Sequence, residues 1–198
     1  MKALLLFVLL LTGCASLDSH FPDARSSVVW LETETNGGSG NLVNSRCVVT
    51  ADHVVNGQTK ARMLTFSKHE YAMNVVAEDE DADIAVLCGD TDIDASVVTF
   101  AKKMPDVYTK VFTVGFPLHT PWFLTEGRYE DGDMISTEIA PGNSGGGVFD
   151  EDGHYMGFVD ALKVYQGTYL FPHLCLIVTG EDVKDFLTAN HIEYKVAK

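Results

Sequence analysis

Three short motifs along the chain carry a serine, a histidine and an aspartate whose chemistry is complementary. Ser144 stands in the glycine-rich segment PGNSGG, His53 ends the segment VVTADH, and Asp83 directly precedes the apolar segment IAVL. A serine hydroxyl is a weak nucleophile until a base removes its proton, and the ordinary pKa of imidazole suits that task near neutral pH. An aspartate on the second ring nitrogen fixes the tautomer of the base and stabilises the imidazolium. The set therefore predicts acyl transfer with Ser144 as nucleophile, His53 as general base and Asp83 orienting the base.

The backbone around Ser144 suits the same reaction. The glycines of this segment let the chain fold tightly, so that the N–H groups of Gly142 and Ser144 can point together at a developing oxyanion. Loss of one such donor costs about 2.7–4 kcal/mol of transition-state stabilisation. We expect the oxyanion hole at Gly142 and Ser144.

The serine motif alone has a second interpretation. A Gly-x-Ser-x-Gly pattern also marks the nucleophile of α/β-hydrolases, where a helix follows the serine. Here the segment GVF and an acidic, glycine-containing turn follow Ser144, which indicates a hairpin. An esterase of that other fold would also need its acid and histidine after the serine, with Asp160 and either His173 or His191 as candidates. No alternation of strands and helices supports them.

The identity of the acid also has alternatives. Asp81 and Asp52 lie close to Asp83 and His53 in the sequence, and Asp81 ends the acidic run EDED, which is typical of a solvated turn. Asp83 is separated from that run by Ala82 and stands at the entrance of an apolar strand. We therefore favour Asp83 as the acid.

Short apolar, β-branched segments separated by turn residues fill the chain from Ser26 onward. They form two series of about six strands with a polar, proline-containing segment between them. This pattern predicts an all-β fold of two packed antiparallel six-stranded β-barrels. The first series is expected at 26–33, 40–43, 47–50, 62–66, 73–77 and 84–87, with turns at 36–40 and 44–45, and the second at 107–114, 123–129, 133–139, 147–149, 155–164 and 174–178.

A single helix is expected at the C-terminal end. Thr179 and Asp182 have the spacing of a capping box, and apolar residues follow at helical spacing up to Asn190, a plausible stop. The predicted organisation is an N-terminal barrel at 26–100 that carries His53 and Asp83, a linker at 101–106, and a C-terminal barrel with the closing helix at 107–190 that carries Ser144.

The first residues are expected to be a targeting segment. A positive start is followed by nine apolar residues, too few to span a bilayer, and the last of them begins the segment LTGC. This tetrapeptide resembles a bacterial lipobox, so we predict a signal peptide at 1–14, lipidation at Cys14 and a short tether at 15–25. Cleavage after Ala15 and an uncleaved anchor are the alternatives. The prediction implies a periplasmic or cell-envelope lipoprotein held at the membrane by its lipid.

Charge and cysteine content exclude some classes of partner. The net charge of −14, which becomes −15 without Lys2, argues against nucleic acid as a partner.

Besides Cys14 the chain has three cysteines, so at most one disulfide can form among them, and the strand-like settings of Cys47 and Cys88 favour plain buried thiols over pairing with each other or with Cys175. None of the acidic clusters has the spacing of an EF-hand loop, and we expect no metal and no cofactor.

Taken together, TADH, DIAVL and GNSGG resemble the three catalytic motifs of trypsin-like, chymotrypsin-fold serine proteases, in particular the bacterial HtrA/Deg-type protease domain without a PDZ domain. The order matches, with gaps of 30 and 61 residues, and the segments VGFP, TEGRY and YMGFV add further matches, so that the resemblance covers roughly residues 26–190. It implies a serine endopeptidase that acts on protein or peptide substrates. No cysteine flanks His53 and no IVGG-like mature start is present, so activation by a freed N-terminus is not expected.

The resemblance also implies a specificity pocket. Glu138 lies six residues before Ser144, where trypsin-like proteases place the floor of the pocket, and a carboxylate there would favour Lys or Arg before the cut. Phe158 and Val159 belong to the strand that pairs with substrate in this family. Alternatively, Glu138 points to solvent, because a register shift of one residue reverses a strand side chain.

A second class of function is a surface-anchored binding module on an inactive protease scaffold. The sequence contains no pattern that we can tie to an oligomeric state.

Overall fold

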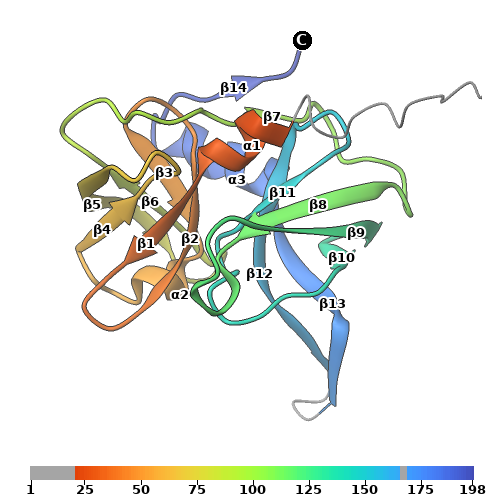
Figure 1. The fold of residues 1–198 in the computed structure, drawn as a ribbon. Coiled ribbons are helices and arrows are strands. Elements are labelled where there is room, and N and C mark those ends of the chain that lie inside the picture. The colour runs from red at the N-terminus through yellow and green to blue at the C-terminus, as the bar shows by residue number, and fades with distance from the viewer. Residues whose placement is uncertain (1–20, 166–168) are drawn as a thin grey trace, which may run out of the picture.

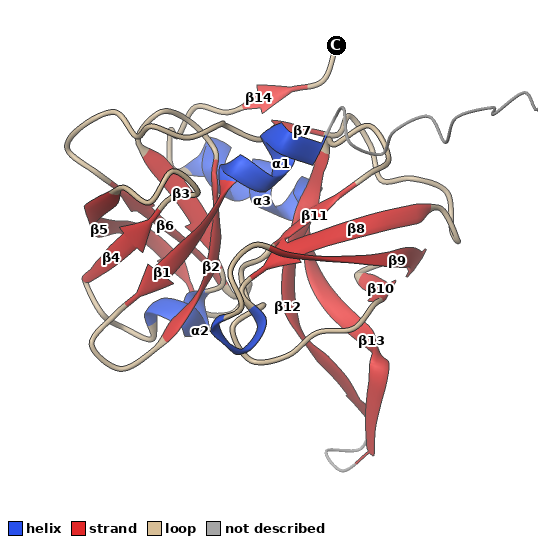
Figure 2. Ribbon diagram, viewed as in Figure 1, coloured by secondary structure: helices blue, strands red, loops and turns tan. Residues whose placement is uncertain are grey.

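The computed structural model describes residues 21–165 and 169–198. Two barrels lie side by side, one formed by the first half of the chain and one by the second (Figure 1). A short helix, α1 (Phe21–Ser27), leads into the first barrel, and the longer helix α3 (Gly180–Ala189) follows the last barrel strand (Figure 2).

The first barrel is closed by six antiparallel strands in the order β1-β2-β3-β6-β5-β4. Pairing of β1 with β4 completes the ring. A four-residue helix, α2, interrupts the run of strands directly after β3. The bounds are β1 (Val28–Glu32), β2 (Gly37–Leu42), β3 (Cys47–Thr50), α2 (Asp52–Val55), β4 (Lys60–Leu64), β5 (Glu70–Asp79) and β6 (Ile84–Cys88).

The second sheet closes in the same way. Its order is β11-β8-β9-β10-β13-β12, and the additional pairing of β11 with β12 makes a six-stranded antiparallel barrel. Two short strands, β7 and β14, extend the sheet beyond β12 by parallel pairing. The bounds are β7 (Thr99–Phe100), β8 (Lys110–Gly115), the 3-10 turn η2 (Pro117–His119), β9 (Phe123–Asp131), β10 (Met134–Ser136), β11 (Gly147–Phe149), β12 (Tyr155–Tyr165), β13 (Tyr169–Thr179) and β14 (Lys195–Val196).

The larger hydrophobic core fills the first barrel and continues across the boundary between the barrels. Phe116 and Trp122, from the segment between β8 and β9, belong to this core, and their ring centroids lie 4.7 Å apart. The Trp122 indole donates a hydrogen bond of 2.7 Å to the carbonyl of Val28 in the first barrel. A second core inside the other barrel contains Val148, Val159 and Cys175. The barrels are therefore joined by packed aromatic side chains.

The predicted fold class is confirmed: the chain forms two six-stranded antiparallel barrels and a C-terminal helix. Half of the predicted capping box forms, because the Thr179 side chain accepts a hydrogen bond from the Asp182 N–H, and Asn190 is the C-cap. The segment 101–106 contains neither helix nor strand. Cys14 lies outside the described residues.

Three local expectations differ from the structure. Residues 21–27 form α1, although 21–25 were expected to end the tether and 26–27 to begin the first strand. The Ser27 hydroxyl of this helix donates to the Ala24 carbonyl. The glycine-rich segment expected to be a turn is most of β2, because Gly37–Asn41 pair with β1. The strand expected at 133–139 is limited to the three residues of β10.

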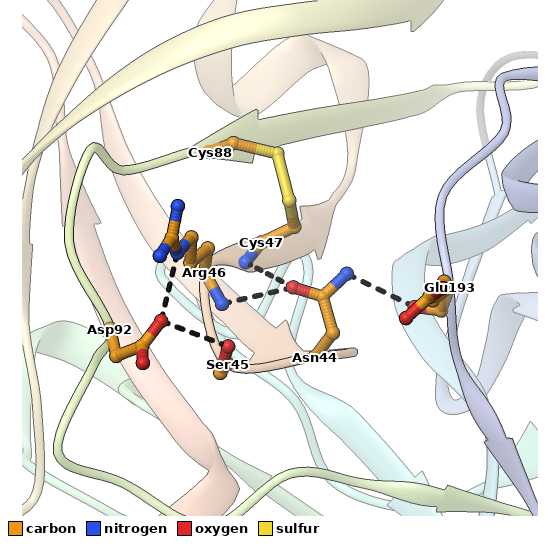
Figure 3. Close-up of a disulfide and its surroundings, with 7 residues drawn as sticks. All are labelled: Asn44, Ser45, Arg46, Cys47, Cys88, Asp92 and Glu193. Carbon is orange, nitrogen blue, oxygen red and sulfur yellow. Dashed lines mark hydrogen bonds and ion pairs between the residues drawn. A yellow bond between two sulfur atoms is a disulfide. The ribbon is translucent and has the colours of Figure 1, made fainter.

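Cys47 and Cys88 form a disulfide, so the prediction of two plain thiols is wrong (Figure 3). The cysteines are direct partners in the register of β3 and β6, with their Cα atoms 4.2 Å apart. β3 and β6 are not consecutive in the chain, and this pairing was not part of the prediction. The Asn44 side chain accepts hydrogen bonds from the N–H groups of Arg46 and Cys47 beside the disulfide. Cys175 is buried and free.

Within the described residues, no helix has the length and apolar character needed to cross a membrane.

Candidate active site

The pairing of β3 with β6 brings His53 and Asp83 together. Thr50 pairs with Ala85, so the chain leaves β3 toward His53 at the same end at which Asp83 enters β6. The Asp52 N–H donates to the Asp83 carbonyl at 3.2 Å, which ties α2 to the start of β6. Apolar residues on both strands are fully buried, which fixes the direction in which the two polar side chains leave the barrel.

The carboxylate of Asp83 holds both the ring and the backbone of His53. The His53 Nδ1 lies 2.9 Å from Oδ2 and 3.1 Å from Oδ1, and the His53 N–H donates to Oδ1 at 2.9 Å. With its proton on Nδ1, the neutral imidazole keeps Nε2 as an acceptor, which is the form a general base needs. The structure therefore joins His53 to Asp83 in the arrangement predicted for base and orienting acid.

The same contact shifts the titration of both groups. The hydrogen bond with Asp83 raises the pKa of His53, against the opposing effect of burial. Burial by itself would raise the pKa of Asp83, but hydrogen bonds from the His53 side chain and backbone outweigh it and lower that pKa. Asp83 is therefore an anion over the pH range in which His53 titrates.

Ser144 is carried by the second barrel and held against the first. Its carbonyl accepts a hydrogen bond of 2.8 Å from the Ser39 N–H on β2, and the Asn41 side chain donates to the Gly145 carbonyl at 2.8 Å. β2 pairs with β3, the strand that leads to His53. The glycine-rich segment thus docks on the strand next to the base.

Two glycines in this segment have backbone conformations that favour glycine. Gly142 has φ +99° and Gly145 has φ +77°. A Cβ atom on Gly142 would collide with the Phe116 carbonyl, and one on Gly145 would collide with the Ser39 carbonyl. The tight turn around Ser144 therefore requires glycine at both positions.

The N–H groups predicted to form the oxyanion hole have no acceptor among the described residues. The neighbouring carbonyls are occupied, because Leu118 N–H donates to Pro141, the Ser39 hydroxyl to Gly142 and the Ser39 N–H to Ser144. The N–H groups of Gly142 and Ser144 thus donate to no group of the described chain.

The Ser144 hydroxyl donates to the backbone carbonyl of Asp160 on β12, at 3.2 Å. In the described part of the chain, no hydrogen bond joins it to the His53 ring. Hydrogen bonds between nucleophile and base are often long or absent in ligand-free active sites and form when substrate binds. The structure thus brings His53 and Asp83 into contact and leaves the Ser144 hydroxyl turned to the neighbouring strand.

A family model described as a trypsin-like peptidase domain matches residues 38–157, which contain all three motifs. The chain belongs to the trypsin-like peptidase family. Family and relatives together confirm the resemblance to HtrA-type protease domains and support a serine protease at the level of the family.

Known relatives of this trypsin-like chain include a protein of Hahella chejuensis named "Probable periplasmic serine endoprotease DegP-like". It is 27% identical over 147 residues, which cover 67% of this chain and 31% of that protein. The chain thus spans about a third of the length of this relative.

Solved structures with the same fold include two proteases. The protease Rv3671c from M. tuberculosis H37Rv, as an inactive serine-to-alanine mutant, has a TM-score of 0.77 at 19% identity, covering 87% of this chain and 90% of that one. The serine endoprotease from Yersinia pestis has a TM-score of 0.79 at 18% identity, covering 88% of this chain and 66% of that one. These similarities confirm the chymotrypsin-like fold.

Asp160 is a further acidic group at the candidate site of this trypsin-like domain, although its sequence setting suggests a role only in the esterase alternative. Ligand atoms of His53, Asp83 and Asp160 all lie within 4.8 Å of one another. Burial, followed by the negative charge of Asp83, raises the pKa of Asp160 to about 6. The alternation of side chains along β12 was the available signal, since the preceding Val159 points into the core.

The two alternative acids do not contact the base. Among the described residues, neither Asp52 nor Asp81 forms a hydrogen bond with the His53 ring. The pKa of Asp52 is raised, first by burial and then by nearby carboxylates that include Glu78. Asp83 is the acid that the geometry favours.

Residues expected to form the specificity pocket are dispersed. Glu138 is exposed and lines a depression of about 390 Å³ together with Phe123, Leu124 and His173. Phe158 and Val159 are 0% and 1% exposed and pack in the cores, so their side chains line none of the described cavities. Substrate pairing along 155–159 is also excluded at Val159, because its backbone bonds to Gly145 and Gly146 on one side and pairs with β13 on the other.

A second depression borders the glycine-rich turn. It has a volume of about 410 Å³ and connects the loop after β1 with Leu118 and His119 of η2 and with Pro141 and Gly142. A polypeptide lying in it would pass beside Gly142.

Two groups of side chains have the donor types and closeness that a metal ion needs. One is His53 with Asp83 and Asp160, and the other is His154 with Asp150 and Asp152 in the turn between β11 and β12. In the second group the carboxylate of Asp150 already accepts hydrogen bonds from the N–H groups of Asp152 and His154. These hydrogen bonds belong to a turn, and the turn explains why the side chains of the second group lie close together.

Proposed function

We propose that the protein is a serine endopeptidase that cleaves peptide bonds through an acyl-enzyme intermediate. The observation that carries this proposal is the double hydrogen bond of Asp83 to the ring and backbone of His53, beside a glycine-constrained turn that presents Ser144. Membership of the trypsin-like peptidase family supports it.

The proposed reaction uses the groups in the following roles. A rotation about the Cα–Cβ bond of Ser144 takes its hydroxyl from the Asp160 carbonyl to Nε2 of His53. His53 accepts the hydroxyl proton as Oγ attacks the scissile carbonyl, and Asp83 stabilises the imidazolium that results. The N–H groups of Gly142 and Ser144 donate to the oxyanion. His53 then gives the proton to the leaving amine, and water hydrolyses the acyl-enzyme by the same steps.

Proteolysis of an unfolded protein separates this function from that of a binding module. We expect the wild-type protein to cleave casein to peptides, and Ser144→Ala and His53→Ala to lose this cleavage while keeping the circular dichroism of the wild type. Binding of casein without cleavage by folded wild-type protein would favour the inactive-scaffold function. Cleavage that persists in Ser144→Ala would contradict the proposal.

An envelope location is part of the proposal. The name of the Hahella relative is that of a periplasmic enzyme, and the Cys47–Cys88 disulfide suits an oxidising compartment. We further propose anchoring by a lipid on Cys14, for which palmitate labelling that Cys14→Ser abolishes is the expected result. Preference for Lys or Arg through Glu138 stays a prediction.

A further inference from the structure

The carboxyl group of Asp160 completes a chain of contacts that begins at His53. Asp160 follows Val159 on β12, and its side chain points to the face opposite the barrel core, toward the boundary with the first barrel. There a carboxylate oxygen of Asp160 lies within 4.8 Å of the carboxylate of Asp83, which is already bonded to the ring and N–H of His53. Two carboxylates at this distance repel each other when both are ionised, and a single proton between them turns the repulsion into a hydrogen bond.

We propose that Asp160 and Asp83 share one proton at mildly acidic pH, and that Asp160 is a positioning residue that acts on His53 through Asp83. This inference rests on the proposed function, in which His53 is the general base. In its acid form Asp160 donates a hydrogen bond to Asp83 and helps to hold that carboxylate against the imidazole. In its ionised form it places a second negative charge beside the same ring.

The charged groups around the site mostly shift the pKa of His53 in the same direction. Asp160 faces Asp83 and His53 of the first barrel and Asp133 of its own barrel. His53 faces Asp83, Asp160 and Asp52. Every one of these neighbours of His53 is an acid, so each of them in its ionised form favours the imidazolium.

The order in which the groups lose protons follows from these surroundings. Burial, and next the charge of Asp83, raises the pKa of Asp160 to about 6, while the hydrogen bond with Asp83 raises the pKa of His53 above its ordinary range. The shared proton is therefore lost before most of the imidazolium is neutralised. The negative charge of Asp160 is then in place when His53 titrates, and it holds the proton on His53 to higher pH.

The substitution Asp160→Asn tests this proposal because the amide keeps a donor toward Asp83 and removes the titrating charge. In the full chain carrying Ser144→Ala, we expect nuclear magnetic resonance titration of the His53 ring to show a lower pKa with Asp160→Asn than without it. The smaller inflection near pH 6 that reports Asp160 should vanish from the same curve. Asp52→Asn is the matched control, because it removes a nearby charge that does not contact Asp83, and it should lower the pKa of His53 by less.

The pH profile of cleavage gives a second readout. Relative to its own plateau, kcat/KM of Asp160→Asn at the acid limb should exceed that of the wild type several-fold, because loss of a nearby negative charge lowers the pKa of His53. Asp160→Ala should shift the limb in the same direction but lower kcat further, and Asp160→Asn should recover part of that loss.

An unchanged pKa of His53 in the folded Asp160→Asn protein would overturn the inference, as would a shift equal to that of Asp52→Asn. Because the titration is carried out on Ser144→Ala protein, it needs no turnover. Absence of cleavage by the wild type would therefore contradict the proposed function, while the ring titration would still decide whether Asp160 acts on His53.

Discussion

At the scale of single residues, the contact between His53 and Asp83 serves orientation more than stability. The side chains are 48% and 23% exposed, and ion pairs with this much solvent contact contribute little to folding. The geometry, by contrast, is strongly defined, because one carboxylate bonds both the ring nitrogen and the backbone N–H of the same histidine. Substitutions of Asp83 should therefore affect the reaction far more than the fold.

Asp83→Asn should lower kcat for peptide cleavage by about 10⁴-fold, the size of this effect in serine proteases of the family. The amide can donate to Nδ1, which leaves the proton of the neutral imidazole on Nε2 and removes the base. Asp81→Asn, two residues away and without contact to His53, is the matched control and should stay close to wild type. Steady-state kinetics on one peptide substrate measures both variants, and equal activity of the Asp83→Asn protein would show that another acid orients the base.

The residue types and order of the candidate triad could be read from the sequence, because each motif is local. Asp160 could not be assigned in the same way. Alternation along β12 indicates the face from which Asp160 projects, but its position beside Asp83 also depends on how closely the two barrels approach, which is not a local property. The expectation that Phe158 and Val159 line the specificity pocket fails for a related reason. The backbone of Val159 bonds to the turn that carries Ser144, and its side chain packs in the core.

At the scale of elements, the direct pairing of β3 with β6 is the feature that organises the first half of the site. It aligns the ends of two strands that are distant in sequence, and the Cys47–Cys88 disulfide fixes the same pair of strands at their other end. The disulfide closes a loop across a separation of 41 residues that contains α2, β4 and β5. It therefore restricts the unfolded chain around the elements that carry His53 and Asp83.

Replacement of both cysteines, Cys47→Ser with Cys88→Ser, should lower the free energy of unfolding by about 2–4 kcal/mol, because the unfolded chain regains the entropy of the open loop. Urea denaturation of the two proteins measures the difference. Reducing agent should destabilise the wild type by a similar amount and leave the double variant unchanged. Peptide mapping without reductant should yield a linked pair containing both cysteines, and free thiols at both positions would contradict the structure.

The strand pattern of the sequence predicted most elements because short apolar runs and turns alternate clearly. It failed where packing overrides local preference. Gly38 and Gly40 lie in β2, where added Cβ atoms would meet Val54 and Val48, so the close approach of neighbouring side chains, and not a turn, explains these glycines. α1 was missed because the seven residues FPDARSS carry little helical pattern of their own.

At the scale of the whole molecule, the candidate site exists only where the two barrels meet. His53 and Asp83 come from one barrel, and Ser144 and Asp160 come from the other. Hydrogen bonds from Ser39 and Asn41 hold the Ser144 turn on the first barrel, and the Trp122 indole binds the Val28 carbonyl across the same boundary. The approach of Ser144 and Asp160 to the His53–Asp83 pair therefore depends on correct docking of both halves.

Covalent labelling with a fluorophosphonate tests this account most directly, because the reagent reacts only with a serine that a base has activated. We expect one adduct per folded full-length chain, located by mass spectrometry on the peptide that contains Ser144, and no adduct in Ser144→Ala or His53→Ala. An adduct that persists in Ser144→Ala, or a folded wild-type protein that stays unlabelled at excess reagent, would contradict the assignment of Ser144 as the activated nucleophile.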